Sequence, residues 1–470
     1  MADRKDTIYE LIKFANETKF EDIPAQTVQN AKKFIVDIMA CITAGSTAPS
    51  CPEVVKLVSE WGGKEESSVL VYGNKLPAPQ AAYLNTLMGH SRDYDDTLDD
   101  VVLHATVSVI PTCLAVAQRE GNVTGKEFLK AVIMGVDVMS RLSYGAGKSV
   151  YESGWVFTSL FAYFACACSA AMLRHMSTED VINTVGIVLS QAGGIYSATQ
   201  ESTLTKRMQP AFAAQAAVQA AYLTGVGVTG VKNIVDGQKG LYNVYFDGKY
   251  SDEPIVRDLG NVYHIDRLAV KPYPCCRYTH SAIDGVRKLV RDYGIKADEV
   301  ERIDIGTSNM VLNTVCEPLE LRRNPKTVVN GQFSIPFTMA SAIVNGIVKF
   351  DSFDEANRTN PDVLRITNAT YPTVDAEIDA KYGKSCSPSR VKITTKRGVF
   401  ETCVTELWGS PENPMSYDEV VEKLMNVKSY SAYPVVDGGL ERVVAETERL
   451  DSTDDLTAFF TAIENAYDRI

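Results

Sequence analysis

The stretch of this sequence most suggestive of chemistry covers residues 89–100, which read GHSRDYDDTLDD, and is followed by His104. On a helix, His90, Asp93 and Thr97 would lie on one face, at positions i, i+3 and i+7. Because the stretch ends an apolar helical segment, that face can point into a cleft, where aspartate and histidine serve as general acid and base. Asp93, Thr97 and His104 are therefore candidate site residues, although a solvated acidic helix end is an equally supported reading.

The same stretch contains Asp95, Asp96 and Asp99, a spacing that also occurs in the magnesium motif of all-α terpenoid synthases. Carboxylates one helical turn apart can hold hard cations that bind a diphosphate. The sequence has no second motif of that kind, and the α/β segment described below has no place in such a fold. We therefore disfavour this reading, and for Asp99 and Asp100 we favour a solvated helix end.

Two further segments carry clustered cations. Lys206 and Arg207 lie near the start of an Ala-rich helical stretch, where cations beside free N–H groups make an anion site, although a basic helix end on the surface is also common. Residues 271–280 read KPYPCCRYTH, and the two prolines fix where the basic side chains point. In an acidic protein, this rigid basic segment suggests a carboxylate-binding wall, at a junction of the kind that ligands prefer. Its candidate residues are Lys271, Tyr273, Arg277 and His280.

Composition disfavours several classes of function. The formal net charge is −12 and no run rich in Lys and Arg occurs, so we expect no nucleic-acid partner. The ten cysteines form no Cys-x-x-Cys pair, so we expect no iron–sulfur or zinc site. The N-terminal residues lack the apolar core of a signal peptide, and the longest near-apolar run, Phe161–Leu173, is too short to span a bilayer. We therefore expect a cytoplasmic protein without membrane contact.

The first half of the chain is predicted to be helix after helix. Residues 23–43 have Pro24 near their start and Gly45 past their end, which are usual start and stop signals. Further helical stretches are predicted near residues 52–61, 78–93, 107–120, 125–143, 158–174, 178–194 and 207–224. Many are rich in Ala, Leu, Met and Val, and a helix that is apolar on most sides is buried, so we predict a thick helical bundle.

The pattern changes after about residue 265. Three segments alternate like strands, namely 300–306, 391–395 and 399–404, and the last two have the spacing of a hairpin. Helical stretches are predicted between them, and the tail from residue 416 is again helical. We predict a mainly α protein with a large all-α helical-bundle domain and an inserted smaller α/β lid domain. The bundle comprises residues 1–266 and 406–470, and the lid comprises residues 267–405.

Seven blocks of the sequence resemble the MmgE/PrpD family, and together they extend over nearly the whole chain. They read GHSRDYDDT, HATVSVIPTCLAVAQ, GIVLSQAGG, TKRMQPAFAAQAAVQAAYL, VKPYPCCRYTHSAID, GQFSIPF and GSPENP. Any single block is a weak signal, but seven blocks in family order are a strong one. The resemblance implies a helical domain built from both chain ends, an inserted α/β lid, a homodimer and no cofactor.

The resemblance also implies an activity. It indicates a lyase similar to 2-methylcitrate dehydratase, which acts on a small di- or tricarboxylate by proton transfer at a carbon next to a carboxylate. A cis-aconitate-type decarboxylase or an iminodisuccinate-type epimerase is the alternative within the family. A non-catalytic carboxylate-binding protein is the alternative of another class.

Motif matching assigns roles within that chemistry, which requires cations to stabilise an enolate-like charge. We predict four catalytic residues, with His104 as the proton carrier: Asp93, His104, Lys206 and Lys271. We predict five substrate-binding residues and no metal: Thr97, Arg207, Tyr273, Arg277 and His280. Two positions depart from the family pattern, because Val156 and Gln209 stand where many members have histidine. The change removes two proton carriers or carboxylate ligands, and a different or smaller substrate is a plausible consequence.

Overall fold

A computed structural model describes residues 5–201, 203–383 and 385–469. The chain forms two compact units. One contains the residues up to Leu268 together with those from Ser416 onward, and the other, Ala269–Met415, interrupts it in sequence. Helices dominate both units, so the prediction of a mainly α protein is confirmed. Among the described residues, every helix is too short or too polar to cross a lipid bilayer.

The first unit is built from helices of very different lengths. They are α1 (Thr7–Glu17), α2 (Ala25–Gly45), α3 (Cys51–Trp61), α4 (Ala78–His90), α5 (Thr106–Glu120), α6 (Gly125–Gly145), α7 (Val150–Ser153), α8 (Phe157–Leu160), α9 (Ala162–Leu173), α10 (Thr178–Val188), α11 (Ser197–Gln200), α12 (Thr205–Gly225), α13 (Leu241–Tyr245), α14 (Glu253–Val256), α23 (Tyr417–Met425), α24 (Gly439–Glu448) and α25 (Thr457–Glu464). A two-stranded ribbon of β1 (Ser67–Ser68) and β2 (Lys75–Leu76) joins α3 to α4.

The core of this unit forms around α4, α9 and α12. Every residue of α9 except Met172 is buried, and this helix packs on α6, α12, α5 and α10. Small residues bring the helices close together, since a Cβ at Gly45 of α2 would lie 1.8 Å from the Met88 carbonyl oxygen of α4. This close contact fixes the last turn of α4, which leads directly into the first candidate site residues.

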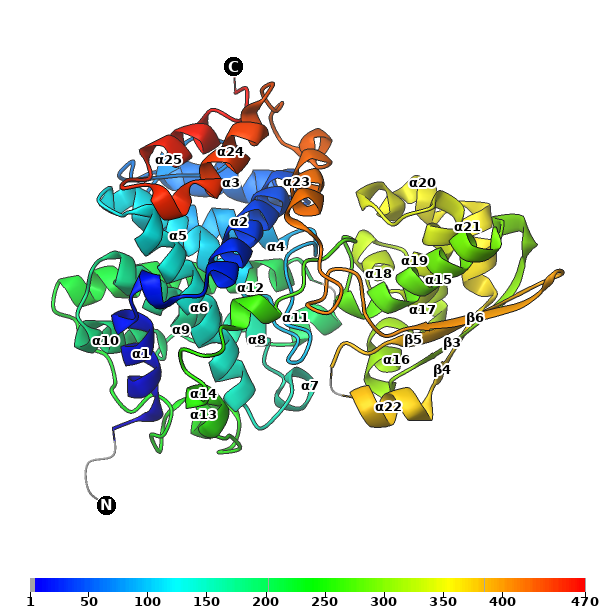
Figure 1. Ribbon diagram of the computed structural model, residues 1–470, viewed down its shortest axis with the longest axis horizontal. Coiled ribbons are helices and arrows are strands. Elements are labelled where there is room, and N and C mark those ends of the chain that lie inside the picture. The colour runs from blue at the N-terminus through cyan, green and yellow to red at the C-terminus, as the bar shows by residue number, and fades with distance from the viewer. Residues whose placement is uncertain (1–4, 202, 384, 470) are drawn as a thin grey trace. The chain divides into compact units, whose positions relative to one another are not determined.

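The C-terminal helices return to the start of the chain. Figure 1 shows α23 and α24, in orange to red, beside the blue helix α2, with the red helix α25 next to α24. α23 and α24 both pack on α2, and the capping box at Ser416, where the Ser416 hydroxyl accepts from the Glu419 N–H, starts α23.

The second unit combines one sheet with helices. Its strands are β3 (Val300–Thr307), β4 (Thr370–Val374), β5 (Ser389–Thr395) and β6 (Gly398–Val404). Its helices are α15 (His280–Tyr293), α16 (Asn309–Val315), α17 (Leu319–Arg323), α18 (Val328–Gln332), α19 (Ile335–Asn345), α20 (Glu355–Arg358), α21 (Pro361–Asn368) and α22 (Ala376–Tyr382). The strand order is β4-β3-β5-β6, with β3 and β4 parallel and the other pairs antiparallel.

The hairpin of β5 and β6 confirms the strand pattern seen in the sequence. Thr395 pairs with Gly398 across the turn, and alternate residues of β5 are buried under α15. Figure 1 shows α15, in green, running along this sheet. α15 begins at His280, the last residue of the basic segment 271–280, and the hydrogen bond from Tyr273 to Asp284 ties that segment to α15. A lid function for this unit stays a prediction.

Candidate active site

The segment between α4 and α5 carries the first candidate residues, and it is not helical. α4 ends at His90, the Ser91 hydroxyl donates to the Leu87 carbonyl at 2.6 Å, and Asp93 has a left-handed backbone with φ of 55°. The prediction that His90, Asp93 and Thr97 share one helix face is therefore wrong. Aspartate adopts this conformation more readily than most residues, so an Asp-rich segment can leave the helical path here.

Asp96 connects this loop with the start of α5. Its buried carboxylate accepts hydrogen bonds from the backbone N–H groups of Ala105 and Thr106, at 3.0 and 3.1 Å, and from the Thr106 hydroxyl. The carboxylate therefore caps the start of α5. Burial, together with the charge of neighbouring Asp95, raises the pKa of Asp96 to about 7.

His104 lies two residues before α5 begins and contacts the backbone of Asp96. Its Nδ1 is 2.5 Å from the Asp96 carbonyl oxygen, and its backbone N–H donates to the Thr158 hydroxyl at 3.1 Å. Because a carbonyl oxygen only accepts, Nδ1 carries the proton and Nε2 is the basic nitrogen of the neutral ring. The side chain is 15% exposed. A fixed tautomer with partial exposure suits a residue that takes up and returns a proton.

A buried carboxylate connects His104 with a second imidazole. The Asp95 Oδ2 atom lies 2.8 Å from the His90 Nδ1 atom and 3.7 Å from the His104 Nδ1 atom. The two imidazole centroids are 5.3 Å apart. Burial lowers the pKa of His90, and the positive charge of Lys206 lowers it further. His90 is therefore held neutral, while Asp95 faces both rings.

The cations at the start of α12 complete this cluster. The Lys206 ammonium lies 3.3 Å from the Asp93 carboxylate. Arg207 is buried, and burial lowers its pKa against the opposing effect of Asp93. Within the described residues, the Nη1 atom of Arg207 has no hydrogen-bond acceptor. A buried guanidinium with such an N–H group is suited to bind an anionic group of a ligand.

The structure of the first unit thus brings together four of the predicted residues, namely Asp93, His104, Lys206 and Arg207. Asp93, Thr97 and His104 come from the loop after α4, and Lys206 and Arg207 come from α12. Thr97 is buried directly after Asp96.

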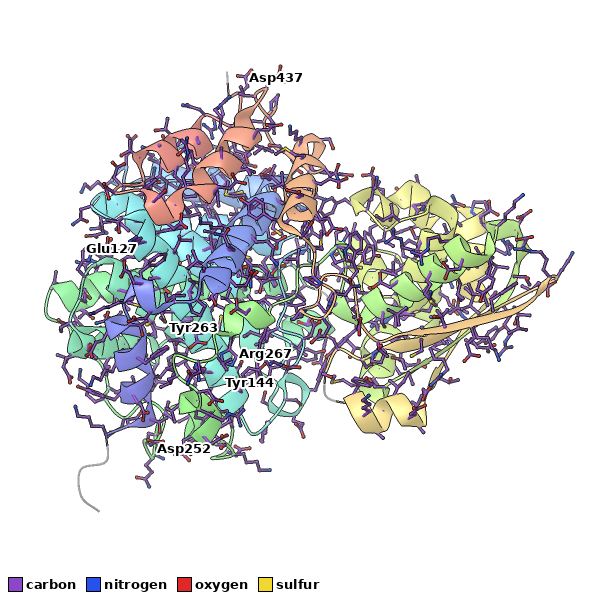
Figure 2. The ribbon with its side chains drawn as sticks, in the orientation of Figure 1. Glu127, Tyr144, Asp252, Tyr263, Arg267 and Asp437 are labelled. Atoms are coloured by element: carbon purple, nitrogen blue, oxygen red, sulfur yellow. The ribbon has the colours of Figure 1, made fainter. Side chains whose placement is uncertain are left out.

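Sequence reasoning missed the roles of His90, Asp95 and Asp96. An Asp-rich run reads the same in sequence whether it is solvated or buried, so only the fold reveals that Asp95 and Asp96 are fully buried. Asp100, by contrast, is exposed as expected, and accepts hydrogen bonds from Tyr144 and Arg267. Figure 2 labels these two partners close together in the first unit.

A second cluster lies within the other unit, on the segment before α15. Lys271 and Tyr273 are fully buried, and Arg277 begins a short 3₁₀ turn, Arg277–Thr279, that leads into α15. The Arg277 Nη1 group donates to the Trp408 carbonyl at 3.0 Å and lies 3.3 Å from the His280 Nδ1 atom. The His280 Nε2 atom is 3.2 Å from the Cys275 carbonyl oxygen. His280 is therefore a neutral ring whose Nδ1 accepts from Arg277.

Tyr273 is held by a buried polar network. Its hydroxyl donates to the Asp284 carboxylate at 2.7 Å and accepts from the Arg287 guanidinium at 2.5 Å. The other oxygen of Asp284 accepts from the Trp408 N–H at 3.0 Å. Burial raises the pKa of Asp284, while the hydrogen bond from Tyr273 opposes this shift. These contacts fix the orientation of the basic segment.

The two positions that depart from the family pattern lie against one loop of the first unit. The Val156 N–H donates to the Gly194 carbonyl at 2.9 Å, and the Gln209 side chain donates to the Ile195 carbonyl at 3.1 Å. Val156 and Gln209 therefore both bind the backbone of the loop at Gly194 and Ile195. The two residues are neighbours in space although they are far apart in sequence.

Stability should depend on the ionisation of Asp96. A pKa raised in the folded state means that this group stabilises the fold fully below its unfolded pKa of about 4, and that the contribution is lost as pH rises through about 7. Asp96→Asn imitates the protonated form. Its melting temperature should therefore fall less than that of the wild type between roughly pH 4 and pH 7. Identical pH profiles by differential scanning fluorimetry would contradict this assignment.

The donor set gives no indication of a metal site. Among the residues that the structure describes, no three His, Cys, Asp or Glu side chains are grouped to hold a metal ion. The carboxylates of the cluster are engaged by Lys206, by imidazoles and by the start of α5.

Comparison with known proteins covers both units. The model of the MmgE/PrpD N-terminal domain matches residues 9–253, and that of the MmgE/PrpD C-terminal domain matches residues 273–435. A cis-aconitate decarboxylase-like protein of Aspergillus oryzae is 26% identical over 97% of this chain and 96% of its own length. A cis-aconitate decarboxylase of Aspergillus terreus is 25% identical over 88% and 87%. The cis-aconitate decarboxylase of Homo sapiens is 24% identical over 92% and 90%. With both domain models matched in order, the chain belongs to the MmgE/PrpD family.

Proposed function

We propose that this protein is a cofactor-independent lyase that acts on a small di- or tricarboxylate by proton transfer at a carbon next to a carboxylate. The observation that carries the proposal is His104, whose tautomer is fixed beside a buried Asp–His pair, and the His90 of that pair lies within the electrostatic reach of Lys206 and Asp93. The names of the relatives, all cis-aconitate decarboxylases or similar to one, support a lyase of carboxylic acids.

Decarboxylation is the first reaction to test, because the relatives carry that name. Loss of carbon dioxide breaks a carbon–carbon bond and leaves its electron pair delocalised toward a remaining carboxylate. Positive charge from Lys206 would stabilise that anion. His104, after taking up a proton from solvent at Nε2, would then deliver it to carbon and return to the neutral form.

Dehydration is the second candidate, since Val156 and Gln209 replace histidines found in many members and leave the exact reaction open. Here His104 would first remove the proton from carbon through Nε2 and then give it to the leaving hydroxyl, which departs as water. Both reactions pass through charge next to a carboxylate, so the same cations serve either one.

Lys271 and Arg277 of the second unit are proposed to bind carboxylate groups of the substrate. Both are buried cations on a segment fixed by prolines and by the Tyr273–Asp284 network. His280 orients the Arg277 guanidinium through its Nδ1 atom.

A panel of acids tests the proposal. Di- and tricarboxylates, with cis-aconitate and 2-methylcitrate among them, are screened by thermal shift, since a ligand of the native state raises the melting temperature. Acids that stabilise the protein are then assayed for release of carbon dioxide, loss of water and racemisation, with and without EDTA. We expect turnover of at least one acid, unchanged by EDTA. Stabilisation without any turnover would identify a carboxylate-binding protein instead.

A homodimer is also proposed, with α12 and the chain after it in the interface. Large apolar side chains are exposed along this region, namely Phe212, Leu223, Val226, Val228 and Val231. Phe212 and Leu223 are about three helical turns apart and so lie on one face. The wild type should have twice the 51.5 kDa mass of one chain by light scattering, and Phe212→Glu should shift it toward the monomer. A monomeric wild type at micromolar concentration would refute this interface.

A further inference from the structure

One buried lysine connects the C-terminal segment with the loop of the proposed active site. Lys423 of α23 donates from its ammonium to the Tyr94 carbonyl at 2.8 Å. The same ammonium lies 3.6 Å from the centroid of the Tyr94 ring. Tyr94 stands between Asp93 and Asp95, whose side chains reach Lys206 and His90. Lys423 therefore holds the backbone of the residue that separates Asp93 from Asp95.

The ammonium is itself fixed by a buried ion pair. Lys423 lies 2.7 Å from Asp37 of α2, and their side chains are 2% and 0% exposed. Burial raises the pKa of Asp37, and the charge of Lys423 opposes this shift. Burying both charges is costly, and an apolar pair of similar volume would often give equal or higher stability. A role beyond stability is therefore worth testing.

The loop needs such an anchor. The left-handed backbone of Asp93 is a conformation that the surrounding structure must maintain. Next to it, the Arg92 guanidinium donates to the Ala44 carbonyl of α2 at 2.7 Å. Arg92 and Lys423 thus fix the residues on the two sides of Asp93. A change of about 1 Å in the position of a catalytic group can lower a rate about a hundredfold.

We propose that Lys423 is a positioning residue of the active site: paired with Asp37, it holds the Tyr94 carbonyl and thereby sets the positions of Asp93 and Asp95. The inference rests on the proposed function for its kinetic consequence. The alternative is that the pair only joins α23 to α2.

The chain offers a matched control for that alternative. Lys32 is also a buried lysine, 3% exposed, that joins α2 to the C-terminal segment. It pairs with Asp451 at 2.8 Å and donates to the Glu448 carbonyl at 2.7 Å. Lys32 therefore has the same kinds of partners as Lys423, but none of these is in the loop 91–105. Lys32→Met measures the effect of losing such a connection without disturbing Tyr94.

The test compares Lys423→Met with Lys32→Met. Both should lower the melting temperature, but only Lys423→Met should lower kcat, by about ten- to a hundredfold, with a smaller change in KM. A kcat for Lys423→Met within about threefold of that of Lys32→Met would overturn the proposal. Should Lys423→Met not fold, Asp37→Asn takes its place, because a neutral amide holds the ammonium less firmly than a carboxylate does and so loosens the contact between Lys423 and the Tyr94 carbonyl. An unchanged kcat in that variant would equally overturn the proposal.

A second measurement separates this inference from the proposed function. The chain has five histidines, so NMR signals of His90 and His104 can be assigned by substitution. These signals should move in Lys423→Met and stay in place in Lys32→Met. If they move but the wild type turns over no acid, the positioning role stands and the proposed reaction fails. If they stay in place, the positioning role fails whatever the activity.

Discussion

Replacing His104 with asparagine should lower kcat by a factor on the order of 10² to 10⁴, with a smaller change in KM. The side-chain amide of asparagine can still donate a hydrogen bond toward the Asp96 carbonyl, which His104 contacts through Nδ1. It has no basic atom to replace Nε2, so the proton transfer to or from carbon loses its carrier. The loss should therefore fall on the chemical step rather than on binding. Steady-state kinetics with the best acid of the screen measure both constants.

His175 is the matched control for this experiment. It belongs to the same unit, but its side chain is 45% exposed and its ring lies near Glu127 on the surface. His175→Asn should leave kcat and KM unchanged. A kcat for His104→Asn within about threefold of the wild-type value would rule out His104 as the proton carrier. In that case His90 would be the next imidazole to test, since Asp95 contacts both rings.

The helical nature of the protein could be predicted because it depends on local composition. α9 is apolar on all sides, and that pattern alone indicates a buried helix. The strands β5 and β6 also followed from alternation and from the spacing of a short turn. Both features depend mainly on residues that are close to one another in sequence. Long amphipathic or apolar stretches therefore give reliable predictions from one sequence.

The loop after α4 shows where this reasoning ends. Its apolar helix was predicted to continue to residue 93, whereas α4 ends at His90 and Asp93 takes a left-handed backbone. The conformation depends on partners that are distant in sequence, since Lys206 holds Asp93 and Lys423 holds Tyr94 across 329 residues. Motif matching selected Asp93 and His104, but it could not reveal that Asp95 and Asp96 are buried beside them.

In the second unit, Arg277→Ala should lower kcat/KM by roughly 30-fold to several thousandfold, which corresponds to about 2–5 kcal/mol. The Arg277 side chain is 4% exposed, so a substrate carboxylate bound to it would form a pair with little water. Lys271→Ala should have a loss in the same range, because Lys271 is also buried on this segment. Substrate binding rather than the proton transfer should be affected, so KM should rise.

Arg277→Lys is the sharper variant because it keeps the charge. The Arg277 guanidinium donates to the Trp408 carbonyl and lies beside the His280 Nδ1 atom, so its plane is fixed in direction. An ammonium has no planar fork and cannot keep these contacts while binding a carboxylate with two parallel hydrogen bonds. We therefore expect Arg277→Lys to lose much of the affinity that Arg277→Ala loses.

A structural control excludes a general effect of removing a guanidinium from this unit. Arg358 also donates to backbone carbonyls there, at 2.9 Å to Phe353 and 2.7 Å to Lys326. Arg358→Lys should lower the melting temperature and leave kcat/KM unchanged. If Arg277→Ala and Lys271→Ala also keep kcat/KM within about threefold of wild type, a change below roughly 0.7 kcal/mol, neither residue binds the substrate. The basic segment would then serve only to position the start of α15, and the carboxylate-binding role would fall to Lys206 and Arg207 of α12.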